Sequence, residues 1–149
     1  AVIGAMNQPY VGDRFIGMPG RSMLNGSSIK TRACLSLETA RLGITDMEMM
    51  KTDAQRRAFN RIATQVEYLR GGGDCYLYAL LAAGQFDLVI EGDLMPWDIQ
   101  ALIPVVEGAG GIVTHWDGAP IRGGGWVIAA GDTALHAQAV ALLKDAAPD

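Results

Sequence analysis

Three acidic residues, Glu91, Asp93 and Asp98, fall within eight consecutive positions of the chain. The preceding residues, Phe86–Glu91, alternate apolar side chains as a strand does, and Pro96 fits the first turn of a helix. In α/β sheets, ligands usually bind where strands end and helices begin. Asp98 falls in the first helical turn, where the helix dipole favours an ionised carboxylate. That carboxylate could bind a hard cation, or it could only complement the dipole.

A second candidate segment is the turn Gly71–Gly73, which is followed by Asp74. Clustered glycines indicate a tight turn in which the backbone approaches other groups closely. Asp74 is well placed to cap a helix over Cys75–Ala83, which Gly84 ends. The sequence therefore predicts a tight turn at Gly71–Gly73 followed directly by a helix N-terminus.

Other potential sites are weaker. Cys34, Cys75, His115 and His136 make a four-ligand zinc set on paper, but they lie 41, 40 and 21 residues apart and lack the paired spacing of zinc sites. The basic residues Arg56, Arg57 and Arg61 are explained by a solvated helix face. Two cysteines are too few for a disulfide framework and fit a reducing compartment, which we take to be the cytoplasm.

The elements that must position these residues change character along the chain. Apolar alternation and turn residues predict a meander of antiparallel strands, and then β-strands and helices alternate. This order predicts an α/β fold of layered helices and a mixed sheet. The expected strands cover 2–6, 10–18, 29–34, 40–45, 66–69, 86–91, 112–116 and 126–130, and helices cover 75–83 and 96–107.

Two further helices are predicted from their N-terminal residues and apolar faces. Thr52 and Gln55 match a capping box, and Asp132 can cap the last helix. The methionines of Met47–Met50 are expected to fill core space, with a partner contact as the alternative.

Length and composition limit the classes of protein. A chain of 149 residues with 50% hydrophobic and 19% charged residues suits one folded domain. The net charge of −4 argues against a nucleic-acid partner, and no apolar run is long enough to span a membrane. Nineteen glycines, nearly twice the usual share of about 7%, predict many tight turns. No role follows for the cluster Gly123–Gly125.

Two runs of residues together resemble a known family. Pro96-Trp97-Asp98, followed by Glu107–Gly111, resembles the second signature of the inositol monophosphatase family. The segments that resemble its histidinol-phosphatase branch in particular are Gly72–Tyr76, Phe86–Glu91, Asn7–Pro9 and Arg14–Gly17. The resemblance implies the layered mixed sheets and helices of this phosphatase fold.

The resemblance also implies roles for four residues. Asp98 looks like the aspartate that ligates a catalytic Mg²⁺, and Glu91 looks like the carboxylate that contacts the leaving alcohol. Gly73 and Asp74 match the turn that faces the substrate. An acid at Asp74 suits histidinol, which carries an ammonium group that inositol lacks, although a capping role for Asp74 stays open.

The family's first signature, Asp-Pro-Ile-Asp-Gly-Thr, and an upstream Glu supply the other metal carboxylates, and neither occurs in this sequence. The chain therefore resembles the C-terminal portion of a phosphatase, incomplete at the N-terminus. Residues 1–45 are expected to end the first sheet and residues 46–149 to form the αβ layers. Asp98 alone would hold at most one ion weakly.

Three functions follow as expectations. The first is Mg²⁺-dependent hydrolysis of a phosphate monoester, with histidinol phosphate as substrate, once the missing portion completes the metal site. The second is the same reaction on inositol monophosphate or a related sugar phosphate. The third is a non-catalytic, truncated module. The resemblance further implies a homodimer, with Met47–Met50 as a candidate contact.

Overall fold

The computed structural model describes residues 1–147 and contains two β-sheets. The first is an antiparallel meander in the order β1-β2-β3-β4. Its strands are β1 (Gly4–Gln8), β2 (Asp13–Met18), β3 (Arg21–Leu24) and β4 (Ser27–Ile29). The meander predicted from the alternating apolar residues is thereby confirmed.

The second sheet is mixed and has the order β6-β5-β7-β9-β8. Its strands are β5 (Arg41–Ile44), β6 (Tyr68–Gly71), β7 (Leu88–Leu94), β8 (Ile112–His115) and β9 (Gly125–Ala130). Strands β6, β5 and β7 run parallel, whereas β9 runs antiparallel to both β7 and β8. The expected α/β class with a mixed sheet is confirmed.

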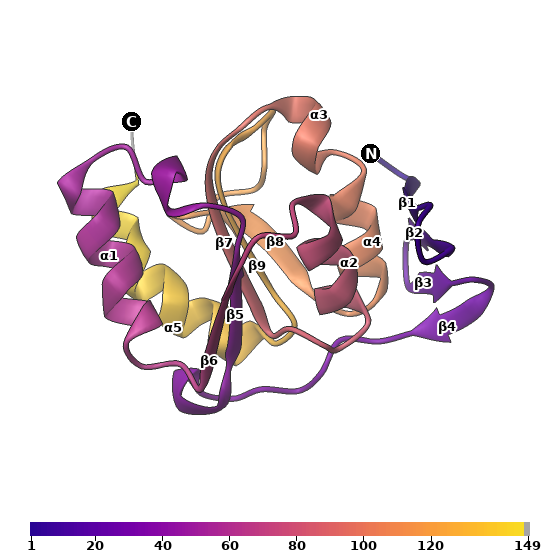
Figure 1. Cartoon of the computed structure of the whole chain (residues 1–149), viewed down its shortest axis with the longest axis horizontal. Coiled ribbons are helices and arrows are strands. Elements are labelled where there is room, and N and C mark those ends of the chain that lie inside the picture. The colour runs from indigo at the N-terminus through magenta and orange to yellow at the C-terminus, as the bar shows by residue number, and fades with distance from the viewer. Residues whose placement is uncertain (148–149) are drawn as a thin grey trace.

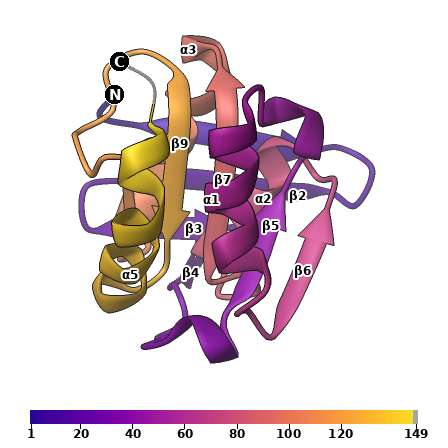
Figure 2. The ribbon, with the colours of Figure 1, turned by 90° about the vertical axis from the view of Figure 1, so that its left-hand side faces the viewer.

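Helices cover both faces of this second sheet. They are α1 (Asp53–Ala63), α2 (Cys75–Ala82), α3 (Pro96–Ile99), α4 (Leu102–Gly108) and α5 (Thr133–Leu143), with short 3₁₀ turns at Leu37–Thr39, Met47–Met49 and Lys144–Ala146. Figure 1 shows α1 and α5 on one face, and α2 and α4 between the two sheets. In Figure 2 the strands of the first sheet run across those of the second, behind it.

Two hydrophobic clusters lie on the two faces of the second sheet. Along β7, Leu88 and Ile90 belong to the cluster under α1 and α5, and Val89 belongs to the cluster with α2 and α4. This alternation follows from the two-residue period of a strand. Both faces of β7 are therefore buried, and the same alternation fixes the face of the sheet on which the Glu91 side chain lies.

The predicted helix caps are confirmed at two positions. Thr52 and Gln55 form a reciprocal capping box at the start of α1. The carboxylate of Asp132 accepts a hydrogen bond of 2.8 Å from the backbone N–H of Ala134 at the start of α5. Each side chain satisfies a backbone donor that the first turn of a helix leaves free.

Several boundaries differ from the sequence-based expectation; for example, β7 covers Leu88–Leu94 rather than 86–91. The helix expected over 96–107 is divided into α3 and α4, because Pro104 has no N–H to donate to the carbonyl oxygen of Gln100. Residues 30–34 form no strand, since this segment crosses between the sheets and Thr31 N–H bonds to the carbonyl oxygen of Ala109. The strand expected over 66–69 starts two residues later, as β6.

Residues 1–45 were expected to belong to the first sheet. This division is wrong, because the last strand of that range belongs to the second sheet. The first sheet ends with β4, and β5 pairs with β6 and β7 in the second sheet. Leu42, Gly43 and Ile44 are all buried, as in a strand covered on both faces. A meander strand with one solvated face would alternate instead.

Candidate active site

A pocket of about 430 Å³ lies where the parallel strands β5 and β7 end. Its lining residues are Thr45, Met49, Asp74, Cys75, Tyr78, Glu91, Leu94, Trp97 and Asp98. They come from the segment after β5, the start of α2, the end of β7 and α3. Three of the four site residues expected from the sequence, Asp74, Glu91 and Asp98, therefore meet in one pocket.

Glu91 forms the buried base of this pocket, with 3% of its surface exposed. Its Oε1 accepts hydrogen bonds from the Thr45 N–H, at 3.2 Å, and from the Thr45 hydroxyl. Its Oε2 accepts a bond of 2.9 Å from the Tyr78 hydroxyl. Burial raises the pKa of Glu91, and the bonds from Thr45 and Tyr78 act against that rise.

Tyr78 comes from α2, one helical turn after Asp74. Its side chain is 1% exposed. Burial, and then the nearby charge of Glu91, raise the pKa of Tyr78 well above its ordinary value. The phenol therefore stays protonated and serves as a neutral donor to the Glu91 carboxylate.

Asp98 lies in the first turn of α3, as its spacing from Pro96 predicts. Its Oδ2 accepts a hydrogen bond of 2.8 Å from the N–H of Met95. The adjacent Trp97 is 74% exposed, so this turn faces solvent at the mouth of the pocket. Asp98 thus stabilises the helix start with one oxygen and also lines the pocket.

Asp74 sits on a turn with an uncommon backbone. Gly72, Gly73 and Asp74 have consecutive positive φ values of 85°, 121° and 47°. Positive φ costs free energy for a residue other than glycine, and such positions cluster at functional sites. The Asp74 side chain makes no hydrogen bond to the start of α2, so the capping interaction is not formed. Its carboxylate lines the pocket instead.

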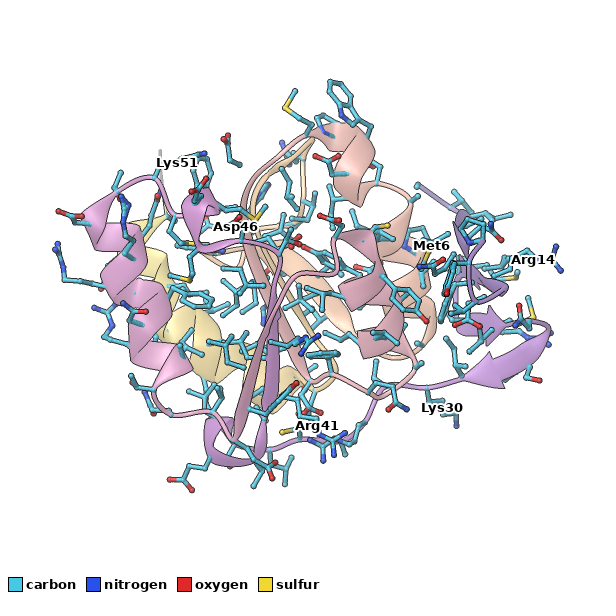
Figure 3. The ribbon with its side chains drawn as sticks, in the orientation of Figure 1. Met6, Arg14, Lys30, Arg41, Asp46 and Lys51 are labelled. Carbon is cyan, nitrogen blue, oxygen red and sulfur yellow. The ribbon has the colours of Figure 1, made fainter. Side chains whose placement is uncertain are left out.

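Two of the residues singled out in the sequence lie elsewhere. Asp93 is exposed, and its Oδ2 lies 3.6 Å from Nζ of Lys51. Gly73 lines a separate hollow beside Tyr68 and Phe86 and reaches the pocket only through its neighbour Asp74. In Figure 3, the labelled Asp46 lies just beyond the end of β5 that faces the pocket, and the labelled Arg41 lies at the opposite end of this strand.

The chain is similar to known proteins over almost its whole described length. The sequence model of the family described as "Inositol monophosphatase family" matches residues 1–147. The chain belongs to this family. It is 41% identical to "Bifunctional phosphatase IMPL2, chloroplastic" of Arabidopsis thaliana over 96% of this chain and 44% of that protein. It is 27% identical to "Histidinol-phosphatase" of Chlorobaculum parvum over 78% of this chain and 45% of that protein.

Solved structures of the inositol monophosphatase family share the fold. The inositol monophosphatase of Zymomonas mobilis superposes with a TM-score of 0.90 at 38% identity, over 96% of this chain and 57% of that chain. The inositol monophosphatase of Anabaena superposes with a TM-score of 0.84 at 24% identity, over 98% and 61%. This chain therefore spans about half the length of the curated relatives it matches and is incomplete relative to the solved structures.

The pocket can provide only part of a metal site. Its acidic lining offers the hard oxygen donors that Mg²⁺ prefers, and the exposed turn that carries Asp98 leaves this carboxylate accessible. Within residues 1–147, no three His, Cys, Asp or Glu side chains are grouped as metal ligands. Asp98 therefore offers a cation one accessible carboxylate, and the described residues alone do not form a complete ligand set.

Sequence reasoning missed the two residues that hold Glu91 and the apolar side of the pocket. Thr45 directly follows a buried strand parallel to β7, so its place at the same sheet edge was detectable once β5 was assigned to this sheet. Tyr78 lies four residues after Asp74, which places both on one face of α2. Met49, Leu94 and Trp97 line the apolar side of the pocket. Trp97 belongs to the run Pro96-Trp97-Asp98, but its place in the pocket lining was not predicted, and Met49 and Leu94 belong to no signature.

The cluster Gly123–Gly125 supports the site structurally. A side chain on Gly124 would collide with the backbone of Leu94 and Met95, directly before α3. The carbonyl oxygen of Gly123 accepts a bond of 3.1 Å from the Gln100 side chain. The glycine segment thus packs closely against the backbone that leads to Asp98.

Proposed function

We propose that this chain is the C-terminal portion of a Mg²⁺-dependent phosphatase that hydrolyses histidinol phosphate to histidinol. The observation that carries the proposal is the convergence of Asp74, Glu91 and Asp98 on one pocket. The pocket lining contains no Lys or Arg among the residues described here. An acidic pocket can receive a phosphate dianion only when cations neutralise the charge, as metal-dependent phosphatases require.

Asp98 would hold one Mg²⁺, together with ligands from outside the described chain. Bound Mg²⁺ polarises phosphoryl oxygens, lowers the pKa of a water nucleophile and stabilises a leaving alkoxide. Glu91 accepts a hydrogen bond from the alcohol portion of the substrate and so orients it. Asp74 places a negative charge opposite the substrate ammonium, and Trp97 with Leu94 offers an apolar wall for its ring.

Two observations favour histidinol phosphate. Several relatives are named histidinol-phosphatases, from Chlorobaculum parvum, Streptomyces coelicolor and Mycobacterium tuberculosis. The Asp74 carboxylate is also left free of the helix start, which suits a cationic group. Inositol monophosphate is the second candidate, because the solved structure from Zymomonas mobilis described as an inositol monophosphatase is 38% identical.

The test is phosphate release by the complete protein, with histidinol phosphate and inositol monophosphate, with Mg²⁺ or with a chelator. We expect turnover of histidinol phosphate that the chelator abolishes. Turnover of inositol monophosphate alone would contradict the substrate. Turnover by the 149-residue chain alone would contradict the incomplete metal site, and no turnover by the complete protein would favour a non-catalytic module.

Assembly and compartment remain part of the proposal. We expect a homodimer, but only Met47 of the suggested methionine contact is well exposed, and Met50 is buried in the core. Met50 therefore supports the core role given to these methionines. Cys34 and Cys75 are free thiols, which fits the reducing cytoplasm expected from the sequence. In the described part of the chain, no helix has the length and apolarity that a membrane span needs.

A further inference from the structure

The Glu91 carboxylate has almost all of its hydrogen-bonding capacity occupied. It accepts two bonds from Thr45 and one from Tyr78. A carboxylate has about four acceptor positions, so about one is left for a ligand in the pocket. The direction of that remaining position depends on where the other three are held.

The two oxygens of Glu91 are held by different parts of the fold. Oε1 is bound by Thr45, which follows β5, and Oε2 is bound by Tyr78 on α2. The terminal torsion of a glutamate is soft, so a carboxylate held at one oxygen can still rotate. Tyr78 itself is fixed, because its ring is packed in the core with Leu77 and Leu81.

We propose that Tyr78 and Thr45 are positioning residues that aim the free acceptor of Glu91 at the alcohol portion of the substrate. This inference rests on the proposed function. Neither residue needs to touch the phosphoryl group, since each acts on the orientation of Glu91. Because Glu91 contacts the part of the substrate that is present in ground state and transition state alike, the loss should be expressed in KM more than in kcat.

The first experiment compares Tyr78→Phe with Tyr76→Phe in the complete protein, using the phosphate monoester that the wild type hydrolyses. Tyr76 is the matched control, because it lies on α2, donates a bond of 2.7 Å to Asp13 and does not line the pocket. We expect Tyr78→Phe to raise KM about tenfold with kcat within about twofold. Tyr76→Phe should leave both constants at wild-type values.

The second experiment is a double-mutant cycle with Glu91→Gln. If Tyr78 acts through Glu91, Tyr78→Phe should change KM by less than about twofold in the Glu91→Gln background. An equal KM effect in both backgrounds would overturn the inference, as would wild-type kinetics for Tyr78→Phe. An inactive wild type would instead overturn the proposed function, so the two failures are distinguishable.

Thr45 keeps the inference testable if Tyr78→Phe does not fold. Thr45→Ser retains the hydroxyl donor to Glu91, whereas Thr45→Val removes it at similar size. We expect a severalfold higher KM for Thr45→Val and a KM near the wild-type value for Thr45→Ser. Equal KM values for the two variants would overturn the role of the hydroxyl.

Discussion

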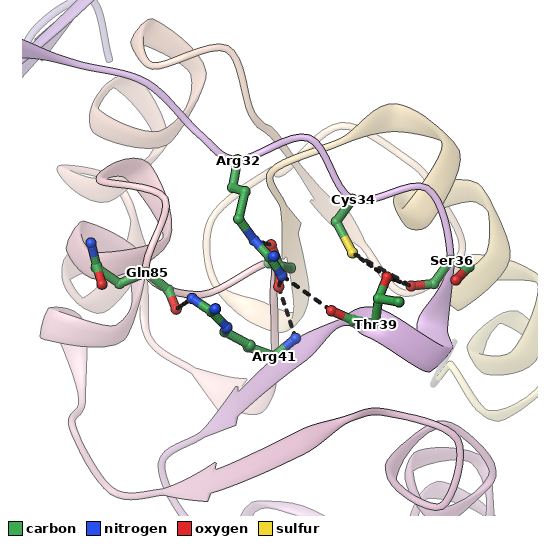
Figure 4. Close-up of polar contacts among 7 residues, drawn as sticks. Arg32, Cys34, Ser36, Thr39, Arg41 and Gln85 are labelled. Carbon is green, nitrogen blue, oxygen red and sulfur yellow. Dashed lines mark hydrogen bonds and ion pairs between the residues drawn. The ribbon is translucent and has the colours of Figure 1, made fainter.

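Two buried carboxylates, one directly before β7 and one in the middle of this strand, are held in different ways. Asp87, just before the strand, is 0% exposed, and its carboxylate accepts bonds of 2.8 Å from Nε and 2.5 Å from Nη2 of Arg32. The N–H of Arg41 donates a third bond of 2.8 Å. Figure 4 shows Arg32 and Arg41 converging there, with Arg32 also donating to the carbonyl oxygen of Thr39. Glu91, four residues later, has only the neutral donors Thr45 and Tyr78.

The difference separates a structural carboxylate from one that is available for binding. Arg32 neutralises the charge of Asp87. The hydrogen bonds of Arg32 also connect the segment that crosses between the two sheets to the second sheet. The charge of Glu91 has no cationic partner among the residues that line its pocket. A hydroxyl or ammonium group of a substrate can therefore supply the missing donor.

The largest expected effect is on stability at Asp87. Asp87→Asn places an amide N–H₂ against Arg32 and the Arg41 N–H, which are all donors. Breaking this buried pair should lower the free energy of unfolding by about 3 kcal/mol in a urea titration. Arg41→Gln is the control, because its backbone N–H remains and its side chain makes only a 3.4 Å bond to Gln85. Equal free energies of unfolding for the two variants would contradict a structural role for the Asp87 carboxylate.

The next effect is on turnover at Asp98. Asp98→Asn keeps the acceptor for the Met95 N–H and removes the charge that a cation needs. In the complete protein, kcat/KM with Mg²⁺ should fall about a hundredfold or more, with thermal stability close to that of the wild type. Unchanged Mg²⁺-dependent turnover would exclude Asp98 as a ligand.

A smaller effect is expected at Asp74. Asp74→Asn suits the positive φ of 47° and removes only the charge. If Asp74 meets an ammonium group, KM for histidinol phosphate should rise about tenfold, and KM for inositol monophosphate should change much less. Equal changes for the two substrates would leave Asp74 as a structural residue of the turn.

The smallest effect is the pH dependence of stability that Glu91 contributes. Its folded pKa is raised above the ordinary value of 4.5 by burial, so the folded protein binds this proton more tightly than the unfolded chain. The stabilisation is complete below pH 4.5 and is lost as pH rises through the folded pKa. Relative to wild type, Glu91→Gln should therefore become progressively more stable as the pH rises through this window. A difference that is constant with pH would contradict the raised pKa.

Local patterns predicted the elements of the site better than its long-range contacts. The apolar alternation before Glu91 places this residue in a strand, and the proline before Asp98 places Asp98 in the first turn of the next helix. The structure confirms both placements, although the strand continues to Leu94. The contact between Thr45 and Glu91 joins residues 46 positions apart and depends on the parallel pairing of β5 with β7. As long as that pairing is unknown, nothing in the sequence distinguishes Tyr78 from an ordinary core residue or Thr45 from an ordinary loop residue.

The ion pair directly before β7 had no local sequence signal either. Arg32 and Asp87 are 55 residues apart, and Arg32 lies in a segment expected to be a strand. The division between α3 and α4 did have a signal, because Pro104 interrupts helical hydrogen bonding. A strand at the position of β5 was also expected from the sequence, but its place in the second sheet was not.

The most direct measurement compares Glu91→Gln with wild type in the complete protein, by kcat/KM for histidinol phosphate with Mg²⁺ and by free energy of unfolding. A glutamine can accept from Thr45 and donate to the Tyr78 oxygen, so the fold should tolerate it. We predict at least a tenfold loss of kcat/KM with a stability no more than about 1 kcal/mol below that of the wild type. Unchanged kcat/KM, or a loss of stability as large as that of Asp87→Asn, would contradict a binding role for Glu91.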